Sequence, residues 1–103
     1  MKKFLFLLLL STSLSAQIDR TEPPFWFSGM KNGELQIMFY GKNLSQYETS
    51  VSNHVQIKNV IKTENPNYQF VTIDIQNVPP SELIFTFKKG KESFKRSFQL
   101  KPR

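Results

Sequence analysis

Residues 23–45 read PPFWFSGMKNGELQIMFYGKNLS, and this stretch carries the strongest fold signal in the chain. Within it, Leu35, Ile37 and Phe39 occupy every second position. This period of two places the three side chains on one face of a β-strand. Glycine- and asparagine-containing turn sequences, GMKN before the strand and GKN after it, bound the run on both sides. The stretch therefore predicts a half-buried strand between two turns.

The same pattern continues along the rest of the chain. Turn residues recur every eight to twelve positions, as in β-sandwiches. Asn65-Pro66-Asn67 predicts a tight turn, and Gly90 can supply the positive φ that a hairpin between the last two runs requires. No sustained 3.6-residue apolar stripe indicates a helix after residue 16. We expect an all-β sandwich of about seven strands, with further runs at residues 47–52, 55–62, 68–75, 83–87 and 94–100.

The first 16 residues have the composition of a signal peptide. Lys2 and Lys3 precede an unbroken apolar run at residues 4–10, and small residues lead to Ala16. A membrane span needs about 20 apolar residues, so this run is too short to be a stable anchor. The sequence predicts a signal peptide at residues 1–16 and one domain at residues 17–103, located in the periplasm or secreted.

Composition excludes several functional classes. The chain has 103 residues, no cysteine and a formal net charge of +6. Its basic residues are spread out, except for a group at residues 88–96 where a hairpin turn is expected. A solvated turn that discourages edge pairing explains that group. We therefore expect one domain and no nucleic-acid partner.

No residue pattern predicts catalysis, a metal or a cofactor. His54 is the only histidine and lies in a polar turn sequence, whereas a metal site needs several ligands at defined spacing. Glycoside hydrolysis needs two carboxylates about 5–10 Å apart. The eight acidic residues occur singly, although the sequence leaves open that two of them meet in space.

The aromatic triplet Phe25, Trp26 and Phe27 is the one functional-looking cluster. Consecutive strand residues point to opposite sides, so Trp26 is expected to face away from Phe25 and Phe27. Packing in the core or on a neighbouring domain is one interpretation of the triplet. Direct stacking on a sugar ring is the other, because aromatic rings pack well on the apolar faces of sugars.

Several strings resemble one enzyme family in order and spacing: IDR at residues 18–20, PFW at 24–26, GMKN at 29–32, YGKN at 40–43, ENPNYQF at 64–70 and FTFKKGK at 85–91. Together they are similar to the N-terminal domain of bacterial cyclomaltodextrinases and neopullulanases, of the α-amylase family. The resemblance implies an immunoglobulin-like, early-set sandwich ahead of a catalytic barrel in cis. It places the catalytic acids in that barrel and none in this chain. Phe27 stands where a tryptophan is more typical of the family.

Three functional hypotheses follow. The first is a non-catalytic accessory domain of a secreted α-glucan hydrolase, in a chain that is a fragment because the barrel is absent. The alternative is a stand-alone carbohydrate-binding module for starch-like glucans or cyclodextrin that uses Trp26. A third is a periplasmic adhesion or assembly domain that recruits another chain by strand addition.

Overall fold

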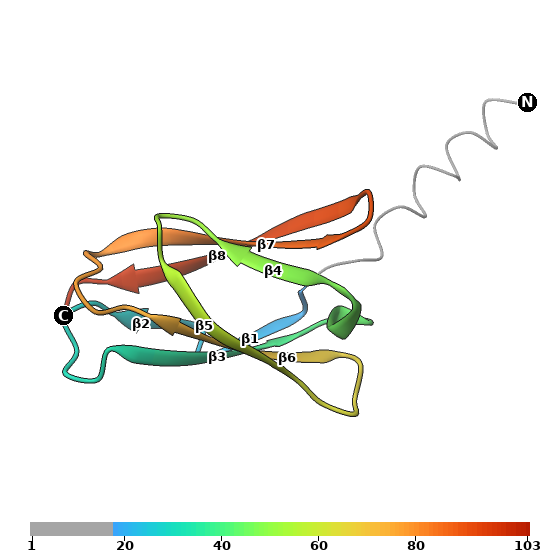
Figure 1. Ribbon diagram of the computed structural model, residues 1–103. Helices are drawn as coiled ribbons and strands as arrows, with labels where there is room; N and C mark the ends of the chain where they lie inside the picture. Colours follow the sequence, from blue (N-terminus) through green and yellow to red (C-terminus); the bar gives the residue numbers. More distant parts are fainter. Residues whose placement is uncertain (1–17) are drawn as a thin grey trace, which may run out of the picture.

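The computed structural model describes residues 18–103, so the predicted signal peptide lies outside the described part of the chain. These residues form two packed four-stranded sheets, with strand orders β1-β3-β6-β5 and β2-β8-β7-β4 (Figure 1). The elements are β1 (Arg20–Glu22), β2 (Phe25–Phe27), β3 (Glu34–Tyr40), the 3-10 turn η2 (Leu44–Gln46), β4 (Glu48–Val51), β5 (Gln56–Lys62), β6 (Tyr68–Asp74), β7 (Ser81–Lys89) and β8 (Glu92–Lys101).

The predicted all-β sandwich is confirmed. The described residues contain eight strands where about seven were expected. Strands β1 and β2 have three residues each, which is too few for an alternating pattern to be visible in the sequence. Gly90 takes the positive φ that the β7–β8 hairpin was expected to need, at 59°.

The core lies between the sheets and is rich in phenylalanine. Strand β3 buries every second residue, as its alternation predicted, and Ile37 and Phe39 are fully inaccessible. The ring of Phe39 lies 5.0 Å from that of Phe85 and 5.2 Å from that of Phe87, both on the opposite sheet. These inclined aromatic pairs join the two sheets and add to the burial of apolar area.

One polar side chain is fully buried in this core. Gln69, on β6, donates from its Nε2 to the carbonyl oxygens of Leu44 and Tyr47 at 2.8 and 2.9 Å. Its Oε1 accepts a hydrogen bond from the Thr49 hydroxyl. The loop around η2 crosses from β3 in one sheet to β4 in the other, so Gln69 ties this crossing to the core.

The only parallel pairing among the described strands joins β2 to β8. The chain leaves β1 in one sheet and enters β2 in the other at Pro23-Pro24. Residues 25–27 then pair with residues 99–101, and the Ser28 N–H donates to the Lys101 carbonyl at 2.9 Å. The aromatic triplet is thereby placed beside the end of the last strand.

Candidate functional site

The structure divides the aromatic triplet between two sides of β2, as the sequence predicted. Trp26 pairs with the buried Leu100 and packs against the core. Phe25 and Phe27 pair with Gln99 and Lys101, whose side chains are exposed. Trp26 therefore contributes mainly to packing, whereas Phe25 and Phe27 form an outward-facing pair. A sugar-binding or domain-interface role for the triplet stays a prediction.

The outward pair forms a compact apolar cluster at the end of β8. The rings of Phe25 and Phe27 lie 5.6 Å apart at 85°, and Phe25 keeps 36% of its surface exposed. The Lys101 ammonium lies 4.0 Å from the centre of the Phe25 ring, a cation–π distance. The Arg103 guanidinium donates to the Gly29 carbonyl at 3.2 Å. Residues that follow β2 and residues that follow β8 therefore lie together on one edge.

Two carboxylates meet on the outer face of the β1-β3-β6-β5 sheet. Glu34 and Asp74 are direct cross-strand partners. The Lys58 ammonium donates to Glu34 at 2.7 Å, and its pKa is raised by this hydrogen bond and then by the charges of Glu34 and Asp74. An Asp74 oxygen accepts from the Gln76 N–H at 2.9 Å. A glycosidase acid instead needs an apolar pocket that raises its pKa, and these groups lie on an open face.

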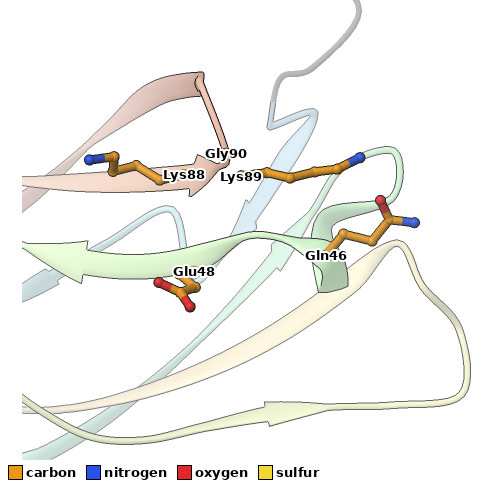
Figure 2. A pocket seen from close by; sticks show the side chains of 5 residues that line it. All are labelled: Gln46, Glu48, Lys88, Lys89 and Gly90. Atoms are coloured by element: carbon orange, nitrogen blue, oxygen red, sulfur yellow. The ribbon is translucent and has the colours of Figure 1, made fainter.

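A hollow of about 400 Å³ lies where the β7–β8 hairpin passes η2 and β4. It is lined by Gln46, Glu48, Lys88, Lys89 and Gly90. Figure 2 shows the amines of Lys88 and Lys89 pointing in opposite directions, as consecutive strand residues do. Since the polar groups do not converge, the hollow has no constellation for catalysis.

The described part of the chain has neither a cluster of metal ligands nor a membrane-spanning helix. Among residues 18–103, no group of three or more potential ligands comes together to hold a metal ion. His54 lies in an exposed turn with a positive φ of 57°. No helix in this region has the length and apolar character of a membrane span.

The outer face of the β1-β3-β6-β5 sheet holds residues that sequence reasoning missed. The rings of Tyr40 and Tyr68 lie on adjacent strands, 4.9 Å apart and inclined at 56°. Phe70 lies beside Tyr68, with ring centres 6.2 Å apart. We call the following set the tyrosine face: Met38, Tyr40, Ile61, Tyr68 and Phe70. The sequence did contain a signal for this face. In β3 and β6, apolar or aromatic residues occur at outward-facing as well as inward-facing positions, although a solvated face is usually polar.

A family model described as "Cyclomaltodextrinase, N-terminal" matches residues 20–103. The chain belongs to this family. The match covers all eight strands, so the resemblance found in the sequence and the observed sandwich agree. In this family the sandwich is the N-terminal domain of a cyclomaltodextrinase, which implies a catalytic domain in cis in the parent protein.

Proposed function

We propose that this domain is a non-catalytic accessory domain that packs against the α-amylase-type catalytic domain of an α-glucan hydrolase. The observation that carries the proposal is the position of Phe25 and Phe27 beside the end of β8. In the parent family the catalytic domain follows the N-terminal domain, so the connection between them lies beyond β8. An outward-facing aromatic pair at that point, with Phe25 exposed and Phe27 half-buried, supplies the kind of anchor that interfaces use.

The chemistry of this edge supports docking more than catalysis. Phe25 and Phe27 present apolar area, and Lys101 lies over the Phe25 ring. The only directly opposed carboxylates among the described strand pairs, Glu34 and Asp74, lie on the outer face of the other sheet and bind Lys58 and a backbone N–H. We therefore assign hydrolysis to the catalytic domain. We assign export of the protein to the periplasm or beyond to residues 1–16, acting as a signal peptide.

Calorimetric titration with a separately produced cyclomaltodextrinase barrel that lacks its own N-terminal domain tests the docking. We expect saturable binding, weakened about tenfold in the variant Phe25→Ser/Phe27→Ser, which removes a hot-spot pair. Ile84→Ser is the matched control, because Ile84 lies on the outer face of the same sheet, opposite Ser97. Equal binding by wild type and the double variant would contradict the docking edge.

Hydrolysis assays of the protein alone test the non-catalytic assignment. Cyclodextrin and pullulan should both remain intact, since the opposed acids Glu34 and Asp74 lie on an open face and bind Lys58 and a backbone N–H. Turnover above the background of a mock purification would overturn this part of the proposal.

A further inference from the structure

The tyrosine face is an apolar and aromatic surface on the outer side of a sheet whose inner side already forms the core. Its five residues project away from Ile37, Phe39, Val71 and Ile73, which fill the sandwich. Ile61 keeps 46% of its surface exposed, and Tyr40, Tyr68 and Phe70 are half-buried. The outer face of the opposite sheet is largely polar along β7 and β8. A cluster of five apolar and aromatic residues on the outer face of a sheet indicates a contact with another molecule.

The size of the tyrosine face decides between a protein and a small ligand. Its residues lie on three neighbouring strands spaced about 4.8 Å apart, in two rows about 7 Å apart along the strands. With the borders of the side chains included, its surface area is on the order of 200 Å². A stable protein interface buries about 800 Å² on each partner. The area therefore suits a ligand of a few rings. It also lies at the end of the sandwich away from the C-terminus and from the proposed docking edge (Figure 1).

The groups around the aromatic residues are suited to a neutral ligand with many hydroxyl groups. Arg20 and Glu22 on β1 carry opposite charges and lie 3.9 Å apart, and the Arg20 guanidinium also lies 5.8 Å from the centre of the Tyr40 ring. The hydroxyls of Tyr40 and Tyr68 have no hydrogen-bond partner among residues 18–103. One row further along the sheet, the tyrosine face gives way to the exposed amides of Gln36 and Asn59. Apolar rings followed by amides match a sugar chain, whose rings have apolar C–H faces and hydroxyl edges.

We propose that the outer face of the β1-β3-β6-β5 sheet binds an α-glucan chain, with Tyr40 and Tyr68 stacking on its sugar rings. Gln36 and Asn59 hydrogen-bond to the hydroxyls of the next unit. The choice of an α-linked glucan rests on the proposed function. The face holds one inclined pair, Tyr40 with Tyr68 at 56°, and one nearly coplanar pair, Tyr68 with Phe70 at 14°, so it offers more than one ring orientation for stacking.

Nuclear magnetic resonance titration of the protein with maltoheptaose maps the site without any substitution. We expect saturable shifts at Tyr40, Tyr68 and their neighbours on β3 and β6, with none at Phe25 or Trp26. Cellohexaose, the β-linked control of similar length, should bind about tenfold more weakly. Shifts centred on β2, equal affinity for cellohexaose, or no saturable shift with either sugar would each overturn the proposal.

Substitutions then identify the residues that bind. Tyr68→Ala should weaken maltoheptaose binding about tenfold, whereas Phe25→Ala should leave it unchanged. Ile61→Asp is a second variant at a more exposed position of the same face, and its thermal melting shows whether the fold is kept. If the wild type instead dimerises and Ile61→Asp is monomeric, the face is a protein interface and the proposal is wrong. Loss of docking to the barrel in the earlier titration leaves these sugar measurements unaffected, so the two proposals fail separately.

Discussion

Replacing Gln69 with methionine tests the role of the buried amide in the loop that crosses between the sheets. Methionine keeps the length of the side chain and removes its amide. The carbonyl oxygens of Leu44 and Tyr47 then lose their donor, and the hydroxyl of Thr49 loses its acceptor. The Leu44 oxygen still accepts from the Tyr47 N–H at 3.0 Å, so it is the least affected of the three groups.

The expected cost follows from those contacts. A buried polar group left without its partner costs about 1–3 kcal/mol, and two such groups dominate here. The apolar methionine returns part of that cost, on the order of 1 kcal/mol. With both groups in the middle of that range, the free energy of unfolding should fall by about 3 kcal/mol, which corresponds to a decrease of about 12–24 °C in Tm for a domain of this size.

Equilibrium unfolding in urea measures this difference directly. Gln36→Met is the matched control, because Gln36 is exposed on β3 and should change stability by less than about 0.5 kcal/mol. Amide hydrogen exchange at Tyr47 adds a local measurement, since the loop should open more often in Gln69→Met. If both methionine variants unfold at the same urea concentration, the amide does not hold the crossing and the reasoning is refuted.

Two further predictions concern the β7–β8 hairpin and its contact with Tyr47. Gly90→Ala should lower the free energy of unfolding, measured with urea, by about 1 kcal/mol, because φ at this residue is 59°. A Cβ there would meet no neighbouring atom, so no new contact offsets the strain. An effect no larger than that of Lys91→Ala would contradict this prediction. Burial, then the hydrogen bond to Glu92 and its charge, raise the pKa of Tyr47 above 10.0, so the folded state keeps this proton to higher pH than the unfolded state. The contribution of this proton to stability is complete below pH 10 and is lost as pH rises through the raised pKa. The free energy of unfolding should therefore fall more steeply above pH 10 in wild type than in Tyr47→Phe. Parallel plots of stability against pH for the two proteins would contradict the assignment.

Much of the sandwich was predictable from local pattern. Leu35, Ile37 and Phe39 were assigned to one face from their spacing, and all three are buried. Gly90 was expected to have a positive φ, and it does. The opposite orientations of Trp26 and Phe25 also followed from the alternation of strand residues. Each of these properties depends on neighbours within a few residues, so the sequence contains the necessary information.

Other features depended on contacts between distant segments. Strand alternation places Gln69 on the core face with Val71 and Ile73, but only the crossing loop, more than twenty residues away, supplies the partners of its amide nitrogen. The meeting of Glu34 with Asp74, and of Tyr40 with Tyr68, depends on the register between β3 and β6. Alternation within each strand does not specify that register.

The sequence by itself determined the fold class, the family and the two orientations within the aromatic triplet, because strand periodicity and motif spacing are local properties. The tertiary structure alone decided which distant residues meet. It placed Phe25 and Phe27 beside the end of β8 through the parallel β2–β8 pairing. It also gathered the tyrosine face from three strands onto one side of a sheet. Side chains from separate strands come together only when strand order and register are fixed, and packing between the two sheets fixes both.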